Sequence, residues 1–297
     1  MSDAAAGNFC VIGDPIGHSL SPVIHSFIFR AIGVDLRYDA VRVSSGDLRR
    51  FVEESRRSGR PGFNVTIPHK QAVIPFLDRL DPTASRVGAV NTVQRNGELL
   101  LGFNTDVHGC RTALERAGFK PSGGTTVLFG AGGAARAAVE ALSSLGVGTL
   151  HLFEIDRPRL DRFRSELEAA LAVTIIPLNS DDDVKTALEG SELIVNATPV
   201  GMWPKSDQSP VPSAERIPGS SLVFDMVFNP VETLLLRQAK SRGARTIPGL
   251  VMLVAQAIAA DEIWLDRTLP EKLHADVFTH CLKHMEAHGA ASNTHRG

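Results

Sequence analysis

The stretch 127–136, VLFGAGGAAR, decides how this sequence is interpreted. A short apolar run at 125–129 leads directly into Gly130, Gly132 and Gly133, and small residues continue beyond them at helical spacing. This order predicts a strand that turns tightly into the N-terminus of a helix. The unpaired N–H groups and the dipole of such a helix end suit a pyrophosphate, and glycines let a phosphate approach the backbone closely.

A second strand and an acidic residue extend this pattern. Gly130, Gly132 and Ala135 fit the spacing G-x-G-x-x-G/A, which is a weak signal by itself. The apolar run 149–153 follows and ends on Glu154, at about the twenty-residue distance that a dinucleotide-binding fingerprint requires. A plain strand–turn–helix packed with small residues is the alternative. The strand, the helix and the acid together favour the nucleotide.

Composition narrows the class of protein. The length of 297 residues favours two globular domains, and 43% hydrophobic with 22% charged residues is ordinary for a soluble fold. A net charge of −2 gives no reason to expect nucleic acid or an anionic membrane as a partner. The three cysteines are far apart, which predicts free thiols in a reducing cytoplasm. We find no signal peptide and no apolar run of membrane-spanning length.

The region from about 107 to 245 alternates apolar strands with helices. Strands are predicted at 125–129, 149–153, 173–176, 192–196 and 221–225. This rhythm predicts parallel βαβ units in a doubly wound sheet. We therefore expect an α/β protein of two domains. A Rossmann dinucleotide-binding domain spans 107–246, and a substrate-binding α/β domain is formed by 1–106 plus 247–297.

The rest of the chain also reads as mixed helix and strand. A helix starts at Ser21, with Ser21 as N-cap and Pro22 in the first position. A hairpin is expected at Asn96-Gly97. Further strands are predicted at 9–12, 36–43, 62–66, 89–94 (an edge segment) and 99–101, and further helices at 44–58, 250–266 and 271–287.

Four polar positions in these segments carry candidate chemistry. Lys70 follows the strand 62–66 and should lie at the rim of a sheet, where α/β proteins place functional groups. Ser19 and Ser21 flank a helix N-terminus, where their hydroxyls either bind a carboxylate or polyol or serve only as cap and turn residues. Gln256 is polar within an apolar helix, which is costly if it is buried without a partner.

Eight motifs occur in order along the chain. They are GDPIGHSLSPVIH, GFNVTIPHK, GAVNTV, LGFNTD, GAGGAARA, NATPVGM, DMVFNP and GLVMLVAQA. In this order the sequence resembles the shikimate dehydrogenases and their quinate/shikimate relatives, from roughly Cys10 to Trp264. Eight motifs in sequence are far more specific than any one of them.

The resemblance implies an oxidoreductase that transfers a hydride between NAD(P) and a cyclic hydroxy acid, shikimate or quinate. Lys70 would be the acid/base group, and Asp106 would hydrogen-bond the same substrate hydroxyl. A secondary alcohol loses hydride only as its hydroxyl loses a proton, so a nearby base is required. A Lys–Asp ion pair that only joins two segments is the alternative. The family's remaining substrate contacts fall on Ser19 and Ser21 for the carboxylate and on Thr66, Asn91 and Gln256 for the ring hydroxyls.

The family's cofactor contacts fall on Gly130, Ala131, Gly132, Gly133, Ala134, Glu154, Ile155, Asp156, Thr198, Met226 and Gly249. The turn Glu154-Ile155-Asp156 departs from NADP-dependent relatives, which carry an arginine there that grips the 2′-phosphate. This acidic turn predicts NAD over NADP, although Arg157 and Arg159 keep NADP open. Phe228 is a second departure, because it occupies the position of a substrate-contacting tyrosine.

Several alternatives stay open at this point. The substrate could be a related cyclic acid such as aminoshikimate, or the chain could be a catalytically silent NAD-binding regulator, against which Lys70 and Asp106 argue. We expect a small-molecule substrate bound in a cleft between the domains, and a homodimer is one option. His280, His284 and His288 recur at helical spacing and could bind zinc, but we interpret them as a solvated helix face and expect no metal.

Overall fold

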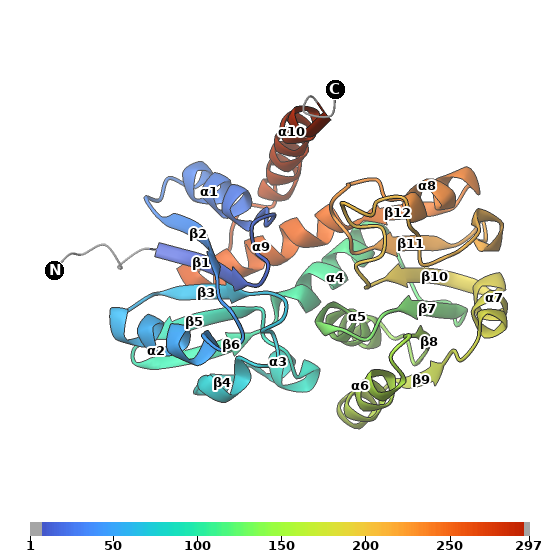
Figure 1. The fold of residues 1–297 in the computed structure, drawn as a ribbon, viewed down its shortest axis with the longest axis horizontal. Helices are drawn as coiled ribbons and strands as arrows, with labels where there is room; N and C mark the ends of the chain where they lie inside the picture. The colour runs from blue at the N-terminus through green and yellow to red at the C-terminus, as the bar shows by residue number, and fades with distance from the viewer. Residues whose placement is uncertain (1–7, 294–297) are drawn as a thin grey trace. The chain divides into compact units, whose positions relative to one another are not determined.

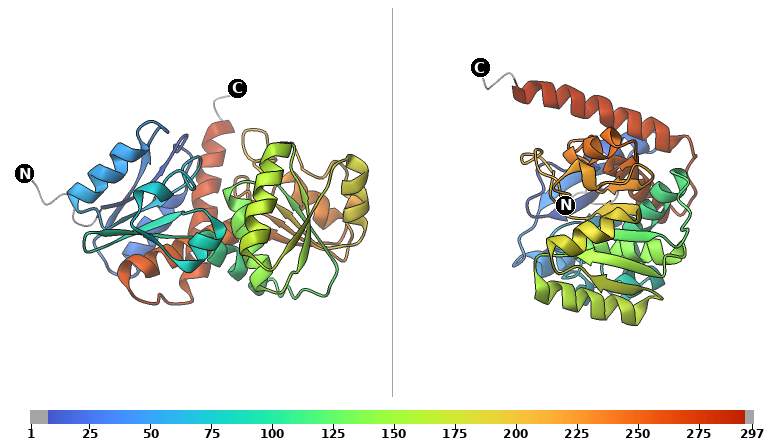
Figure 2. Two further views of the ribbon diagram at one scale, coloured as in Figure 1. Left: turned by 90° about the horizontal axis from the view of Figure 1, so that it is seen from below. Right: turned by 90° about the vertical axis from the view of Figure 1, so that its right-hand side faces the viewer.

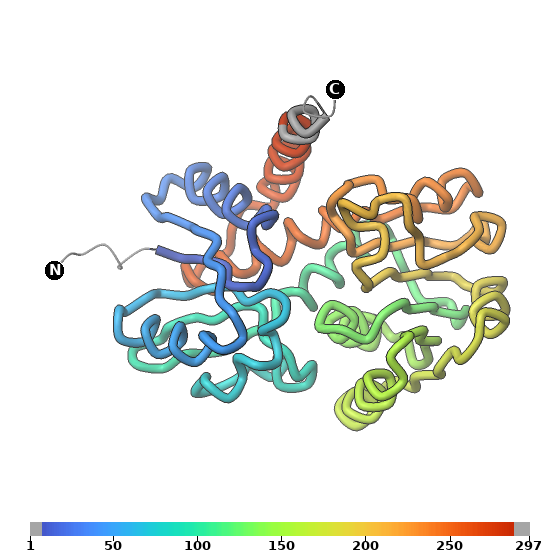
Figure 3. The backbone as a smooth tube through the Cα atoms, viewed as in Figure 1, coloured from blue at the N-terminus to red at the C-terminus, as the bar shows by residue number. Residues whose placement is uncertain are grey.

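A computed structural model describes residues 8–293, with only the backbone described for 288–293. The chain divides into two compact units. The first contains residues 8–85, 89–105 and 254–293, and the second contains 86–88 and 106–253. The predicted domain ranges differ from these units in placing Asp106, 86–88 and 247–253 with the substrate-binding part. In the tube drawing, the blue N-terminal and red C-terminal segments lie together in the first unit (Figure 3).

The first unit is built on a mixed six-stranded sheet with the order β2-β1-β3-β5-β6-β4 (Figure 1). Strand β1 pairs in parallel with β2 and β3, whereas β5 is antiparallel to both β3 and β6. The segment predicted as an edge therefore ends in an internal strand. The strands are β1 (Asn8–Gly13), β2 (Arg37–Arg42), β3 (Gly62–Val65), β4 (Arg79–Leu80), β5 (Thr92–Asn96) and β6 (Leu99–Phe103).

Helices cover both faces of this sheet. Its helices are α1 (Ser21–Ala31), α2 (Leu48–Ser58) and α10 (Leu273–Asn293), with α3 (Pro82–Val87) and a 3₁₀ turn (Ile74–Phe76) at its margin. Alternate residues of a strand point to opposite faces. Accordingly Ile12 packs in one cluster with Leu48 and Val52 of α2, and Val11 packs in another with Phe29 of α1.

The start of α1 corrects one prediction. The helix begins at Ser21, but Leu20 is its N-cap residue and no side chain caps it. The Ser19 hydroxyl oxygen instead accepts the Ser21 backbone N–H at 3.2 Å. This bond lets Leu20 take a helical conformation, so Ser21 lies inside the helix and its hydroxyl is not used as the cap.

The second unit is the predicted doubly wound sheet. Six parallel strands lie in the order β12-β11-β10-β7-β8-β9. When the strands are numbered from β7 and the sheet is read from the β9 edge, this is the Rossmann order 3-2-1-4-5-6. The short strand β12 was not predicted from the sequence. The strands are β7 (Thr125–Phe129), β8 (Thr149–Phe153), β9 (Thr174–Pro177), β10 (Ser191–Asn196), β11 (Leu222–Asp225) and β12 (Arg245–Pro248).

Helices also cover both faces of this second sheet (Figure 2). Its helices are α4 (Thr105–Arg116), α5 (Gly133–Ser144), α6 (Arg157–Ala170), α7 (Asp181–Glu189) and α8 (Leu234–Ser241), with a 3₁₀ turn at Ala214–Arg216. Val127 and Val223 pack against α7 and α8 in one cluster. Half of the buried residues of α5 are alanines, which allow close packing on the strands.

Helix α9 (Gly249–Leu265) is divided between the units after Leu253. It is apolar nearly all round, and Gln256 and Asp261 are buried polar exceptions. In the part of the chain that is described, no helix combines the length and apolarity that crossing a bilayer requires. None of the three cysteines forms a disulfide, as predicted from their spacing, and all three are buried.

Candidate active site

The glycine turn between β7 and α5 has the geometry expected of a phosphate site. Gly130 has φ 99°, and a Cβ built there would lie 2.8 Å from Thr198 Cγ2, so only glycine fits. Gly132 precedes the first turn of α5, and a Cβ built there would meet no atom within 4 Å. Open space therefore lies before the N-terminus of a well-formed helix, which fits a dinucleotide pyrophosphate.

Glu154 connects this turn to the end of β8. Its side chain is only 8% exposed. One carboxylate oxygen accepts the Ala131 N–H at 3.0 Å, and the other accepts the Asp156 N–H at 3.1 Å. The predicted cofactor residues of the two loops are thus joined directly, with a negative charge held at the junction.

Arg157 and Arg159, the two arginines that could bind the 2′-phosphate of NADP, differ in their surroundings. Arg157 donates to the Leu178 and Asn179 carbonyl oxygens, so its guanidinium is committed to the loop after β9. Arg159 is half exposed and lies 3.7 Å from an Asp156 oxygen and 4.0 Å from a Glu154 oxygen. Ile155, between the two acids, is 85% exposed.

A buried network organises the loops after β10 and β11. Asn196 Nδ2 donates to Asp225 Oδ1 at 2.9 Å, and the Thr198 hydroxyl and N–H both donate to Asn196 Oδ1. Thr233 donates to the other Asp225 oxygen at 2.6 Å. Burial nevertheless raises the pKa of Asp225 to about 6, because desolvation outweighs these hydrogen bonds.

The same edge of the sheet carries the last predicted cofactor residues. The Met226 N–H donates to the Asn196 carbonyl oxygen at 2.9 Å. A Cβ built on Gly249 would lie 2.5 Å from the carbonyl oxygens of Met226 and Val227, so α9 must begin with glycine here. Phe228 is partly buried on this loop. The structure thus gathers the predicted cofactor residues at the carboxyl ends of the parallel strands.

Lys70 lies in the turn after β3, as predicted. The Lys70 carbonyl oxygen accepts the Val90 N–H at 2.7 Å, and the Thr66 carbonyl oxygen accepts the His69 N–H at 2.9 Å. These bonds hold the Lys70 turn beside the segment that carries Asn91. Asp106 is 6% exposed in the first turn of α4 and belongs to the second unit.

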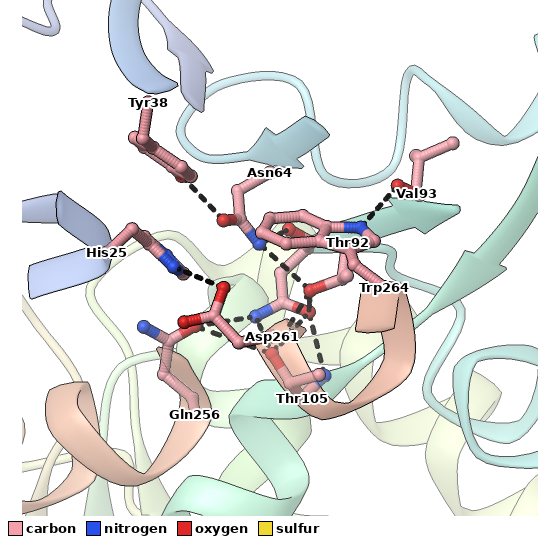
Figure 4. Close-up of polar contacts among 10 residues, drawn as sticks. His25, Tyr38, Asn64, Thr92, Val93, Thr105, Gln256, Asp261 and Trp264 are labelled. Carbon is pink, nitrogen blue, oxygen red and sulfur yellow. Dashed lines mark hydrogen bonds and ion pairs between the residues drawn. The ribbon is translucent and has the colours of Figure 1, made fainter. Parts of the chain in front are cut away.

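Asn91 and Gln256 meet in the first unit, although 165 residues separate them. Asn91 Nδ2 donates to Gln256 Oε1 at 3.3 Å and to Thr105 Oγ1 at 2.9 Å. The Thr105 N–H donates to Asn91 Oδ1 at 2.7 Å. Figure 4 shows this network, with Thr92 and Asn64 continuing it away from Gln256.

The residues behind this pair were not predicted from the sequence. Asn64 donates to the Asn91 carbonyl oxygen and to Thr92, and it accepts the Tyr38 hydroxyl at 2.6 Å. The available signal was a polar residue, Asn64, inside an apolar strand.

A buried pair, His25 and Asp261, joins α1 to α9. His25 Nδ1 lies 2.8 Å from Asp261 Oδ1, and both side chains are fully buried. Burial raises the pKa of Asp261, an effect that the adjacent His25 opposes. The His25 ring stacks on Tyr38 with 4.0 Å between ring centroids. Among the residues whose side chains are described, no three His, Cys, Asp or Glu residues form a metal site, and the His288 side chain lies outside that set.

Known proteins match this chain along most of its length. The family model for the shikimate dehydrogenase substrate-binding domain matches residues 11–93. The shikimate dehydrogenase (NADP(+)) of Moorella thermoacetica is 41% identical over 268 residues, covering 90% of each chain. This chain belongs to the shikimate dehydrogenase family.

Solved structures of shikimate dehydrogenases agree with its fold. The Listeria monocytogenes protein, in complex with shikimate and NAD, has a TM-score of 0.83 and 31% identity over 91% of this chain and 96% of that one. The Thermus thermophilus protein, in complex with NADP(H) and shikimate, has a TM-score of 0.80 and 33% identity over 92% and 98%. The α/β fold with a Rossmann-type unit that the sequence predicted is confirmed.

Proposed function

We propose that this chain oxidises shikimate to 3-dehydroshikimate, and catalyses the reverse reduction, with a nicotinamide dinucleotide as cofactor. The observation that carries the proposal is the buried Asn91–Gln256 network in the unit that also carries Lys70, Thr66, Ser19 and Ser21. Related shikimate dehydrogenases have been solved with shikimate and NAD or NADP(H) bound.

Each residue has a role that follows from its chemistry. Lys70 exchanges a proton with the reacting hydroxyl, and Asp106 hydrogen-bonds the same oxygen. Asn91, Gln256 and Thr66 orient the ring through its hydroxyls, while Ser19 and Ser21 bind the carboxylate. The bound nicotinamide supplies the hydride acceptor or donor. Asn91 and Gln256 are buried, so water competes little for their hydrogen bonds.

Steady-state assays with shikimate and with quinate, each with excess cofactor, test the activity. We expect turnover of shikimate; the carboxylate that Ser19 and Ser21 are proposed to bind is common to both acids, so this contact does not discriminate between them. Absence of turnover on both acids would favour a silent NAD-binding regulator. Turnover of quinate alone would show that the chain shares the substrate preference of quinate-using relatives.

We further propose that the preferred cofactor is NAD. The Glu154 carboxylate can accept hydrogen bonds from a free ribose hydroxyl at the end of β8. It would repel a 2′-phosphate at about 4 Å by roughly 1–4 kcal/mol, between water-like and surface-like screening. Asp156 adds a second negative charge, and Ile155 supplies no counter-charge.

Arg159 is the residue that could reverse this preference. It lies near both acids, so its charge is partly neutralised before any phosphate arrives. An exposed arginine contributes about 0–1 kcal/mol to an ion pair, which is less than the expected repulsion. The relative from Moorella thermoacetica is named for NADP(+), and the acidic turn is where we expect this chain to differ.

A charge exchange in this turn tests the proposal. Replacing Glu154→Asn together with Ile155→Arg removes the repulsion and adds a cation, so the ratio of kcat/KM for NAD over NADP should fall by at least about tenfold, or 1.4 kcal/mol. Arg159→Ala in the native background is the matched control. A large loss of NADP activity in that control would show that Arg159 binds the phosphate.

A further inference from the structure

The buried pair of His25 and Asp261 joins the two helices that carry predicted substrate residues of the first unit. His25 lies one turn after Ser21 in α1, and residues four apart lie on the same face of a helix. Asp261 lies five residues after Gln256 in α9. His25 Nδ1 and Asp261 Oδ1 are 2.8 Å apart, and both side chains are fully buried. This hydrogen bond therefore fixes α1 against α9 close to both predicted substrate residues.

The His25 ring also contacts the side of the unit that holds Asn91. It stacks on Tyr38, with 4.0 Å between ring centroids and 12° between the ring planes. The Tyr38 hydroxyl donates to Asn64 Oδ1 at 2.6 Å, and Asn64 Nδ2 donates to the Asn91 carbonyl oxygen at 3.0 Å. Figure 4 shows His25, Tyr38 and Asn64 in this order. His25 thus lies between the start of α1 and the strand segment of Asn91.

Stability alone does not account for this pair. His25 Nε2 and Asp261 Oδ2 are buried and have no hydrogen-bond partner among the described residues. The rings of Trp264 and Phe29 lie 5.5 and 6.2 Å from the His25 ring, so the surroundings are largely apolar. Replacing a buried pair of this kind by apolar residues is often neutral or stabilising. A polar pair that uses only part of its hydrogen-bonding capacity therefore calls for an explanation other than stability.

We propose that His25 and Asp261 are positioning residues for the substrate. Their hydrogen bond sets α1 relative to α9, and so holds Ser19 and Ser21 at a fixed distance from the residues proposed to bind the ring hydroxyls. The inference rests on the proposed function, because it takes the two serines as the carboxylate site. The carboxylate and the hydroxyls of shikimate are attached to one small ring, so both ends bind well only if their contacts keep a matching separation.

A matched pair of variants at position 261 tests the hydrogen bond. Asp261→Asn keeps an N–H that can donate to His25 Nδ1, whereas Asp261→Leu has the same number of side-chain heavy atoms and cannot form the bond. We expect Asp261→Leu to raise KM for shikimate at least about tenfold while kcat changes by less than about threefold, as for a loss of substrate binding. Asp261→Asn should stay within about threefold of the native chain in both constants.

Two outcomes of this comparison would overturn the proposal. One is a native KM for shikimate in Asp261→Leu, and the other is an Asp261→Asn protein that is as impaired as Asp261→Leu. The KM for the cofactor should stay unchanged in both variants, because the predicted cofactor residues lie in the second unit. Failure of the native chain to turn over shikimate would instead overturn the proposed function, and this inference with it.

An analogue of shikimate with a hydroxymethyl group in place of the carboxylate separates positioning from a general loosening of the site. In Asp261→Leu, kcat/KM should fall at least about tenfold for shikimate and less than about threefold for the analogue, because the analogue has no carboxylate to place against the serines. Equal losses on both compounds would show a general structural role and would overturn the proposal.

A double variant keeps the test usable if Asp261→Leu does not fold. His25→Phe with Asp261→Leu replaces the whole pair by apolar side chains and keeps a ring to stack on Tyr38. We expect its melting temperature to equal or exceed that of the native chain, since no polar group of the pair stays buried. Its KM for shikimate should still be raised at least about tenfold. A stable double variant with native KM for shikimate would overturn the proposal.

Discussion

At the residue scale, the proposed function assigns the proton transfer to Lys70. Lys70→Ala should lower kcat by about a hundredfold or more, the size of effect expected when an acid/base group is removed. Lys185→Ala, which changes an exposed lysine on α7, is the matched control and should be silent. Near-normal kcat in a folded Lys70→Ala protein would assign the proton transfer to another group.

A second prediction at the residue scale concerns substrate binding by the residue at position 228, Phe228. Phe228→Tyr adds a hydroxyl at a position where the family resemblance implies a substrate contact. The resulting gain in kcat/KM for shikimate should correspond to up to about 1–1.5 kcal/mol of transition-state stabilisation, a typical net hydrogen bond. Phe228→Leu adds no hydroxyl and should give no gain. If the tyrosine variant is unchanged or slower in steady-state assays, Phe228 does not face the ring.

The loops after β10 and β11 act together at the scale of elements, because Asn196, Asp225 and Thr233 join them. The Asp225 pKa of about 6 lies above its ordinary value of 3.8. The folded state therefore holds this proton more tightly than the unfolded state, and the free energy of unfolding falls as pH rises from about 4 to about 6.

Asp225→Asn removes this titration. The stability of the variant relative to the native chain should improve between pH 4 and pH 7, by up to about 3 kcal/mol for a shift of roughly two pKa units. Urea unfolding at pH 4, 5, 6 and 7 measures the difference. Asp78→Asn is the contrasting control. Hydrogen bonds from Arg56 and Leu100 lower the pKa of Asp78 below 3.8, so the stability that it contributes is lost only below about pH 4, and Asp78→Asn should show no gain in relative stability from pH 4 to pH 7.

The elements also show what the sequence could predict. The strands 125–129 and 149–153 were predicted at their observed bounds, because each is a short, mostly apolar run ended by glycine or an acid. Strand β12 was missed because it is four residues long and ends in Pro248. The cap of α1 was misassigned because either serine could serve, and the choice depends on local backbone geometry.

The residues of the candidate site also divide into those that the sequence predicts and those that it does not. Lys70 and the glycine turn follow from local sequence, since each lies next to a strand end. Asn64 and Tyr38 could not be assigned from sequence, because their role depends on pairing between strands far apart in the chain. Gln256 was singled out by its polarity within α9, but its partner Asn91 was implied only by the family resemblance.

The whole molecule combines a Rossmann-type unit with a mixed-sheet unit, and the proposed function needs residues of both. The second unit holds the acidic turn of Glu154 and Asp156, which we propose to face the ribose of the cofactor, and the first holds the buried Asn91–Gln256 network, which we propose to bind substrate. A protein that uses shikimate with NAD requires both features to act as described.

The most direct measurement is kcat/KM of the native chain for NAD and for NADP, with saturating shikimate at neutral pH. Repulsion from Glu154 and Asp156 predicts NAD over NADP by at least about tenfold, equivalent to 1.4 kcal/mol. Equal use of the two cofactors, or a preference for NADP, would contradict this prediction.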